Sequence, residues 1–141
     1  MRRVYWDTMV FAYLLEGNAQ FEPQVRAAYD ALVRSGDRLC TSVFTLGELL
    51  VLPRRRGDQV AITAITGFLR SGEVEMVPFN WAAAEQYSVL RADTRLRAAD
   101  AIHLACAIEA GADLFVTNDH DLRRLRGPRL PIIVGLDGRI F

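Results

Sequence analysis

The chain contains no lysine, so all 17 of its basic residues are arginine. This absence excludes mechanisms that depend on a lysine side chain, among them a Walker-type nucleotide site, Schiff-base catalysis and a lysine general base. A charge excess of either sign is also absent, because 17 acidic residues balance the arginines. Overall charge therefore favours neither nucleic acid nor a membrane surface as a partner, and any such contact must come from a local patch.

Cysteines and long apolar runs are scarce as well. Cys40 and Cys106 stand in apolar surroundings at no metal-ligand spacing, so we expect two buried free thiols rather than a disulfide or a zinc site. No uncharged apolar stretch has the roughly 18 residues of a membrane span, and MRRVYWDT at the amino terminus lacks the apolar run of a signal peptide. We therefore expect a cytoplasmic protein that makes no membrane contact.

The sequence does contain enough apolar residues for one domain. With 141 residues, of which 51% are hydrophobic, the chain can bury about two thirds of the surface that it exposes when unfolded. We expect a single domain over residues 1–141. Strands are predicted at five short apolar runs: Arg3–Trp6, Arg38–Thr41, Val74–Val77, Leu114–Thr117 and Ile132–Val134. Strands that are apolar throughout and separated by helices indicate a parallel sheet covered on both faces.

Helical patterns fill the segments between these strands. We predict helices at residues 9–15, 23–35, 45–52, 58–69, 81–91 and 98–110, and a short helix around Leu122. Pro53 is expected to end the third helix, because proline disfavours helical backbone at the residue before it. The helix at 98–110 is apolar almost all round, which is typical of a helix buried on most sides.

Acidic residues occupy positions that attract attention in such a sheet. Asp7 follows the first strand directly, and Asp119 stands two residues beyond Thr117. In open parallel sheets, functional groups gather beyond the carboxyl ends of the strands. Glu48 and Asp100 lie in strongly apolar helical stretches, where an isolated carboxylate has to be paired, protonated or bound to a cation.

If these acids converge, their oxygens favour a hard divalent cation. Neither a cysteine cluster nor a histidine triad is available for zinc, so magnesium or manganese is the expected ion. A carboxylate-held magnesium that keeps several water ligands is the usual device for hydrolysing phosphodiesters.

Each acid also has a purely structural interpretation. Asp7 and Asp119 can cap helices. Thr45 and Glu48 match the S/T-x-x-E capping box. Asp100 stands near the start of its helix, where the macrodipole favours a negative charge. Four independent structural roles explain these positions less economically than one shared site.

Four stretches, in this order, resemble the acidic motifs of the PIN-domain family, and most closely its compact VapC-type toxin members. They are VYWDTMVFAYLLEG, TSVFTLGELLVLPRRRGD, RAADAIHLACA and FVTNDHDL. The resemblance spans Val4 to about Gly135. It implies an α/β PIN fold with a central parallel sheet of four to five strands flanked by helices on both faces.

The same resemblance implies an activity and its partners. Members of this type are endoribonucleases that depend on Mg²⁺ or Mn²⁺ and act as the toxin of a toxin–antitoxin pair. They are usually homodimers, held inactive by a cognate antitoxin whose tail covers or fills the acidic site. RNA is the implied substrate.

Matching the motifs position by position assigns the expected site. The acidic set of the family falls on four residues: Asp7, Glu48, Asp100 and Asp119. Asp7 and Asp100 are expected to contact the metal directly, and the other two are further candidate ligands. Thr8 and Thr117 match positions that orient ligands or water. Asp121 is expected to cap a helix or support Asp119. Trp6 departs from the pattern, which usually has a small aliphatic residue before the first acid.

A nuclease without net positive charge needs local cations for the phosphate backbone. Arginine can bind phosphate with two parallel hydrogen bonds. The expected RNA contacts are Arg54, Arg55, Arg56 and Arg97, with Arg91, Arg95, Arg123, Arg124 and Arg126 as further candidates. Solvated helix ends with surface ion pairs are the alternative for each cluster. His103, three residues after Asp100, is expected to be a hydrogen-bonded core histidine.

Other functional classes fit less well. A PIN domain that binds RNA or a protein without cutting remains open. A receiver-like signalling domain normally needs a lysine near its acidic pocket, and the chain has none. A haloacid-dehalogenase-type phosphatase needs a second aspartate two positions after Asp7, where Met9 stands. His103 with His120 and Asp121 resembles the H…HD…D set of metal-dependent phosphohydrolases, but their fold is entirely helical.

Overall fold

The sheet is the centre of the molecule in the computed structural model, which describes residues 1–137; residues 138–141 of the expected single domain lie outside this range. All the strand pairings are parallel, and the spatial order is β3-β2-β1-β4-β5. The strands are β1 (Arg3–Trp6), β2 (Arg38–Ser42), β3 (Val74–Val77), β4 (Leu114–Val116) and β5 (Ile132–Val134). The predicted parallel sheet is confirmed, and the strand ends differ from prediction by one residue at most.

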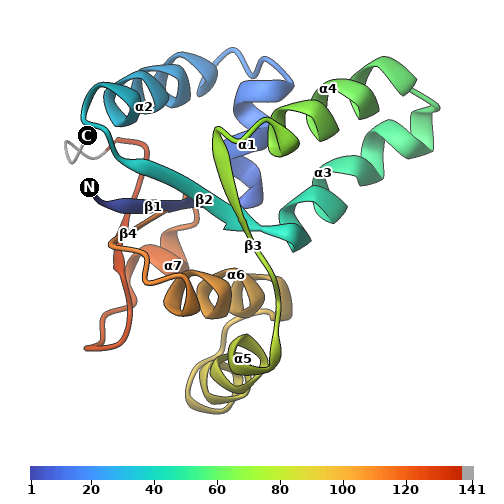
Figure 1. Ribbon diagram of the computed structural model, residues 1–141. Coiled ribbons are helices and arrows are strands. Elements are labelled where there is room, and N and C mark those ends of the chain that lie inside the picture. The colour runs from blue at the N-terminus through green and yellow to red at the C-terminus, as the bar shows by residue number, and fades with distance from the viewer. Residues whose placement is uncertain (138–141) are drawn as a thin grey trace.

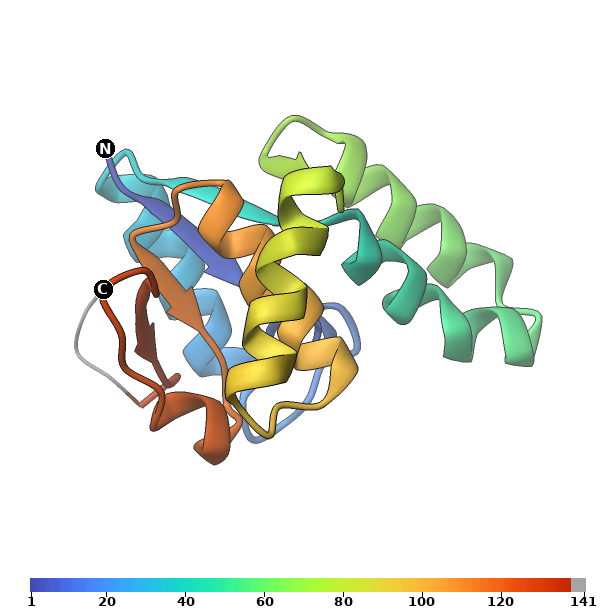
Figure 2. The ribbon, with the colours of Figure 1, turned by 90° about the horizontal axis from the view of Figure 1, so that it is seen from below.

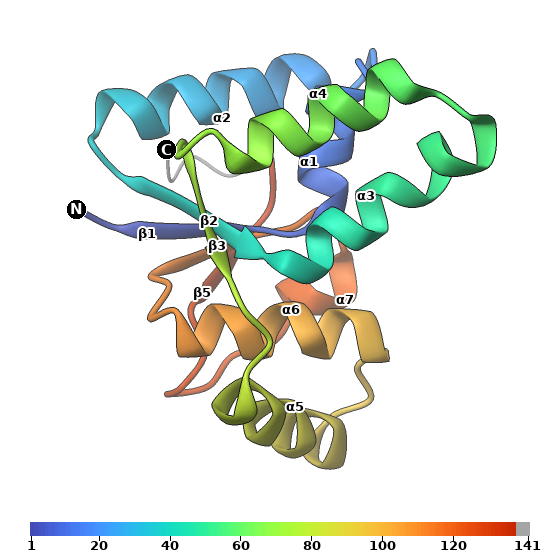
Figure 3. The same cartoon turned by 45° about the vertical axis from the view of Figure 1, so that its right-hand side comes forward.

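Helices cover both faces of this sheet (Figure 1). They are α1 (Thr8–Leu15), α2 (Glu22–Arg34), α3 (Val43–Arg56), α4 (Gln59–Arg70), α5 (Trp81–Asp93), α6 (Ala98–Glu109) and α7 (His120–Arg123). Figure 3 shows α1, α2 and α4 on one face and α5, α6 and α7 on the other. The α3–α4 hairpin starts at the end of β2 and projects beyond the body of the protein (Figure 2). The predicted α/β fold with helices on both faces is confirmed.

The two faces of the sheet carry separate hydrophobic cores, because successive strand side chains point to opposite sides. Val4 and Trp6 of β1 pack with residues of α1, α2 and α4, whereas Tyr5 packs with residues of α6. Tyr5 stacks on Phe115 of β4, with ring centroids 5.1 Å apart. All the side chains of β1 after Arg3 are therefore buried, which fixes the register that aims Asp7 at the sheet edge.

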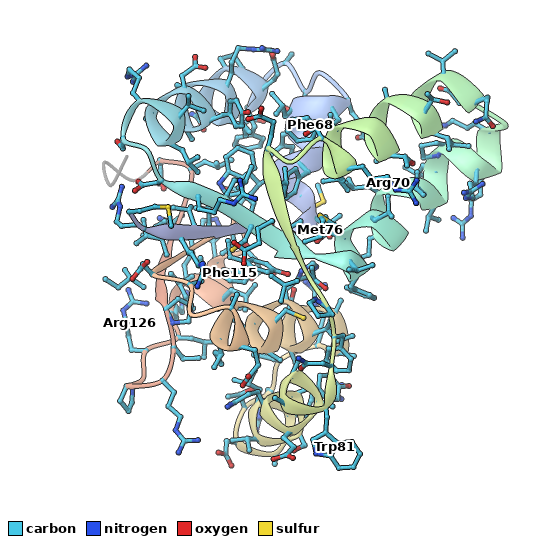
Figure 4. The ribbon with its side chains drawn as sticks, viewed as in Figure 1. Phe68, Arg70, Met76, Trp81, Phe115 and Arg126 are labelled. Atoms are coloured by element: carbon cyan, nitrogen blue, oxygen red, sulfur yellow. The ribbon has the colours of Figure 1, made fainter. Side chains whose placement is uncertain are left out.

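The burial of α6 explains its apolar sequence. The helix lies between the sheet and α5, so it has neighbours on two opposite sides (Figure 1). Its buried residues are Ala101, His103, Leu104, Ala105, Cys106 and Ala107. Trp81, at the start of the outer helix α5, projects into solvent and is 82% exposed (Figure 4).

The α3 helix differs from the sequence prediction at both ends. Ser42 is its N-cap and accepts a hydrogen bond from the Phe44 N–H, so the helix starts before Thr45. Pro53 lies inside the helix rather than after it, and the end comes at Gly57, whose φ of 62° is left-handed. A proline this near the end of a helix removes one backbone hydrogen bond without having to break the helix, and glycine adopts left-handed backbone at no steric cost.

Both cysteines are free and buried, as the sequence predicts. Burial raises the pKa of Cys40 to about 12 and also raises the pKa of Cys106, so neither thiol is ionised at neutral pH. Within residues 1–137, no helix combines the length and the apolar character that crossing a bilayer requires.

Candidate active site

The strand order brings two of the predicted acids to one edge. β1 and β4 are neighbours, with Trp6 opposite Val116, so Asp7 and the segment after β4 leave the sheet side by side. The Asp7 N–H donates a hydrogen bond of 3.3 Å to the Val116 carbonyl. The strand order runs outward in opposite directions from this pair, and open α/β sheets bind their ligands at such a reversal.

Three of the four predicted acids line one cavity of about 210 Å³ at this edge, which we call the aspartate cavity. They are Asp7, Asp100 and Asp119, which follow β1, begin α6 and follow β4 respectively. The other lining residues are Met9, Tyr13, Arg97 and Asn118. Asp7 therefore shares one space with two carboxylates that lie more than 90 residues further along the chain.

Asp7 is the most buried of these acids, with 8% of its surface exposed. Its Oδ1 accepts a hydrogen bond from the Val10 N–H as the N-cap of α1, and its Oδ2 accepts one from the Thr117 hydroxyl. Burial raises the pKa of Asp7 above its usual range; Thr117, His103 and the Val10 N–H act in the opposite direction, and the nearby Asp100 adds to the rise. A cation in the cavity would favour the ionised form.

Asp119 combines a structural role with its place in the cavity. Its Oδ1 accepts hydrogen bonds from the N–H groups of Asp121 and Leu122, so it is the N-cap of α7. The predicted capping role is thus correct, and Oδ2 remains directed at the aspartate cavity, where it meets Arg97. Asp121 is exposed, and its backbone N–H donates the hydrogen bond by which it supports Asp119. The Asp119 carboxylate therefore both caps α7 and lines the aspartate cavity.

Arg97 places a positive charge among the aspartates. Its Nε lies 3.2 Å from Asp100 Oδ2, and its Nη2 lies 3.1 Å from Asp119 Oδ2. The Arg97 side chain is 76% exposed, so it reaches over the cavity from the solvent side. Asp100 and Asp119 raise the pKa of the Arg97 guanidinium further. The sequence predicts Arg97 as an RNA contact, and the structure shows it paired with two of the acids.

Glu48, the fourth predicted acid, does not line the aspartate cavity. It lines a neighbouring cavity of about 190 Å³ with Thr8, and Met9 lines both cavities. Glu48 Oε1 accepts hydrogen bonds from the Thr8 hydroxyl and from His103 Nε2, the latter at 2.8 Å. Burial raises the pKa of Glu48, but the donors His103 and Thr8 outweigh it and the pKa is lowered.

The capping-box interpretation of Glu48 is wrong. Thr45 is buried within α3, and its hydroxyl lies 2.7 Å from that of Thr41. The cap is Ser42, three residues earlier, so neither member of the predicted box has a free helix terminus to satisfy.

His103 is the site-adjacent residue whose contacts the sequence did not reveal. It is 3% exposed and hydrogen-bonded, which confirms the prediction of a core histidine. It also contacts Glu48 and Thr8, which connects it to the predicted site. The spacing of three residues from Asp100 on one helix was the available signal.

The arginines at the end of α3 lie apart from the aspartate cavity. Arg54, Arg55 and Arg56 form the last turn of the projecting helix (Figure 2). Arg56 lines a different cavity, of about 260 Å³, beside Asp58 and Ile65 of the hairpin. A phosphate held at the aspartate cavity would therefore not contact these side chains. They could contact only a more distant phosphate of the same nucleic-acid strand.

The donor set fits a hard divalent ion. Asp7, Asp100, Asp119 and the Asn118 amide provide oxygens around one cavity, and no thiolate or imidazole lines it. The Arg97 guanidinium shows that the carboxylates of Asp100 and Asp119 can share one cation. Among residues 1–137, no set of three or more His, Cys, Asp or Glu side chains is arranged closely enough to enclose a metal without adjustment.

Comparison with known proteins identifies the fold and the family. The model of the PIN-domain family matches residues 4–128. A search of curated proteins found no match. Among solved structures, VapBC2 from Rickettsia felis bound to a promoter DNA fragment matches with a TM-score of 0.76 and 18% identity, over 94% of this chain and 98% of that chain.

Two proteins of Mycobacterium tuberculosis have the same fold. VapC20, a sarcin-ricin loop cleaving toxin, matches with a TM-score of 0.67 and 21% identity, over 84% of this chain and 91% of that one. A VapBC-5 structure matches with a TM-score of 0.61 and 24% identity, over 96% and 98%. The motifs, the sheet order and the family match agree: this chain belongs to the PIN-domain family.

Proposed function

We propose that the protein is an endoribonuclease that hydrolyses RNA phosphodiesters with Mg²⁺ or Mn²⁺ held by Asp7, Asp100 and Asp119. The observation that carries this proposal is the aspartate cavity, where acids from three elements face one space at the carboxyl edge of the sheet. Membership of the PIN-domain family supports the same chemistry, since the resemblance of the sequence motifs implies that these acids occupy the acidic positions of the family.

The proposed chemistry divides between the ion and the chain. A bound divalent ion polarises the phosphoryl oxygen and lowers the pKa of the attacking water. Asp7 and Asp100 hold the ion, and Asp119 is a further ligand. Thr117 keeps Asp7 Oδ2 in position by its hydrogen bond. Thr8 holds Glu48 Oε1, while no described donor meets Oε2, so Oε2 is available to accept a hydrogen bond from a water.

We also propose partners for this site. Arg97 stands at the rim of the aspartate cavity and contacts an RNA phosphate there, whereas Arg54, Arg55 and Arg56 contact a more distant part of the strand. The structural similarity to VapBC toxin–antitoxin structures supports a toxin role and an antitoxin partner. That the antitoxin covers the acidic site and that the protein is a homodimer are further parts of the proposal, and they rest on the family resemblance alone.

Cleavage of mixed RNA by the purified protein tests the proposal. We expect products with Mg²⁺ or Mn²⁺ and none with a chelator, and we expect Asp7→Asn and Asp100→Asn each to abolish cleavage while the fold is kept. Asp93→Asn is the matched control, because Asp93 is exposed at the end of α5. Full activity of both site variants would refute the assignment.

One observation favours the alternative of a PIN domain that binds RNA or a protein without cutting. Asp100 and Asp119 are already paired with Arg97, whose single positive charge balances one of their two negative charges, so the site is partly compensated without a metal. The same assay separates the two: binding of RNA that is never cleaved under any divalent ion supports the alternative.

A further inference from the structure

We propose that His103 is a positioning residue for the reaction: from inside the core it holds the Glu48 carboxylate in one orientation by donating a hydrogen bond from Nε2. At the other side of the ring, the Tyr5 hydroxyl donates a hydrogen bond to Nδ1 of His103. The kinetic part of this inference rests on the proposed nuclease function, whereas its structural part does not.

The network runs from β1 through α6 to α3. The Tyr5 hydroxyl lies 2.8 Å from His103 Nδ1, and His103 Nε2 lies 2.8 Å from Glu48 Oε1 and 3.1 Å from the Thr8 hydroxyl. Tyr5 is fully buried and His103 is 3% exposed. A buried polar chain that is satisfied at every step specifies its geometry more strongly than the same groups do in water.

The chemistry of the partners decides where the imidazole hydrogen lies. Glu48 is a carboxylate, which accepts hydrogen bonds and cannot donate them when ionised. Nε2 must therefore carry a hydrogen, because an unprotonated Nε2 would face the Glu48 oxygens with its lone pair at 2.8 Å. The Thr8 hydroxyl accepts from the same Nε2–H and gives its own hydrogen to Glu48.

The far side of the ring agrees with this placement of the hydrogen. The Tyr5 hydroxyl oxygen already accepts a hydrogen bond of 3.1 Å from the Ser42 N–H. Its hydrogen is then free to be donated to an unprotonated His103 Nδ1. The Phe115 ring stacked on Tyr5 keeps that hydroxyl in place. The backbone at the N-cap of α3 is thereby linked to the acid on the same helix.

The consequence for Glu48 is a difference between its two oxygens. Oε1 receives both donors, whereas Oε2 receives none from the described residues. The two donors restrain the carboxylate through Oε1 and leave Oε2 without a donor from residues 1–137. An apolar residue at position 103 would fill the same space in the core but could not donate a hydrogen bond to Glu48. Positioning of Glu48 by His103 is therefore distinct from packing.

Two substitutions divide the network at the ring. The amide of His103→Gln can stand where Nε2 stands and still donate to Glu48. The shorter His103→Asn places its amide near Nδ1, where it meets Tyr5 but cannot reach Glu48. We expect kcat for RNA cleavage to remain within about threefold of the unchanged protein in His103→Gln and to fall roughly 10- to 100-fold in His103→Asn, with KM unchanged in both.

Spectroscopy tests the structure without activity. We expect long-range ¹H–¹⁵N spectra of the unchanged protein to show a hydrogen on Nε2 of His103. Since the chain has two histidines, His120→Gln assigns the signal. The Glu48 carboxyl ¹³C resonance is expected to move in His103→Asn and to stay in His103→Gln.

The outcomes are distinct. An Nε2 that carries no hydrogen, or equal kcat for the two His103 variants with equal Glu48 resonances, overturns the inference. If the unchanged protein cleaves no RNA, the proposed function fails, and the ring tautomer and the Glu48 resonance still decide whether His103 positions this carboxylate. If His103→Asn does not fold, the tautomer of the unchanged protein and the kcat of His103→Gln decide.

Discussion

The hydroxyl of Thr117 donates a hydrogen bond of 2.5 Å to Oδ2 of Asp7, which joins the end of β4 to the end of β1. Both residues are buried. A donor to a carboxylate stabilises its charged form, so this contact opposes the larger effect of burial on the pKa of Asp7. The residue that follows β4 thereby influences the ionisation of the acid that follows the adjacent strand β1.

Thr117→Val tests this contact, because valine keeps the shape of threonine and removes the donor. We expect the pKa of Asp7 to rise further and the free energy of unfolding at neutral pH to fall by about 1–3 kcal/mol. Carboxyl ¹³C NMR and urea unfolding measure the two effects. Thr117→Ser, which keeps a hydroxyl, is the control; identical results for both variants would show that the hydrogen bond contributes nothing.

The raised pKa of Asp7 makes a prediction about pH. The folded chain holds a proton on Asp7 at pH values where the unfolded chain has lost it, so the free energy of unfolding falls as the pH rises through this interval. The loss begins above the ordinary carboxyl pKa of about 4 and is complete above the folded-state pKa. Ionised Asp7 is therefore destabilising at neutral pH without a cation.

Asp7→Asn removes this titration and keeps the N-cap of α1, since asparagine caps helices as well as aspartate does. With a chelator present, we expect the variant to be more stable than the unchanged protein at neutral pH and the difference to shrink toward about pH 4. Urea unfolding at a series of pH values measures this difference, in which the other carboxyl groups cancel. A variant that is less stable at neutral pH contradicts the prediction.

Arg97→Gln tests whether the guanidinium competes with a divalent ion for Asp100 and Asp119. Removing the competing charge is expected to tighten Mn²⁺ binding by roughly twofold to tenfold, a modest gain because exposed ion pairs are weak. Calorimetric titration measures the affinity. Arg95→Gln changes the charge nearby without removing an ion pair seen in residues 1–137, and equal affinities for the two variants would exclude competition.

Glu48 and Asp100 are expected to differ in metal binding, since they line different cavities. Asp100→Asn should weaken Mn²⁺ binding by about tenfold or more, whereas Glu48→Gln should change it by less than about threefold. Both substitutions should reduce RNA cleavage. A loss of Mn²⁺ affinity in Glu48→Gln as large as that in Asp100→Asn would place Glu48 among the metal ligands.

The strands were predictable from sequence because their side chains are apolar on both faces. Val4, Tyr5 and Trp6 are all buried, so local hydrophobicity alone marks β1. The ends of α3 were not predictable in this way. Ser42 is the last residue of β2 and also the N-cap of α3, and Pro53 is accommodated inside the helix. The sequence signals therefore placed the start of the helix too late, at Thr45, and its end too early, before Pro53.

The acids of the candidate site were predictable as strand-end and helix-start residues, but not their grouping. Asp7 and Asp119 proved to cap helices and to line the aspartate cavity together. The separation of Glu48 depends on Met9, which lines both cavities, and on the partners Thr8 and His103. The distances between side chains on different helices and strands depend on how these elements pack. The spacing of residues along the sequence does not determine them.

The two tryptophans occupy opposite environments. Trp6 is completely enclosed next to Asp7, and its Nε1 has no hydrogen-bond partner among residues 1–137, whereas Trp81 stands in solvent with its Nε1 bonded to Glu85. An indole so enclosed fluoresces at shorter wavelengths than one surrounded by water. With Trp81 replaced by phenylalanine, the chain therefore retains a single tryptophan, one peptide bond from Asp7, and the filling of the cavity becomes visible as a change in the light that this indole emits.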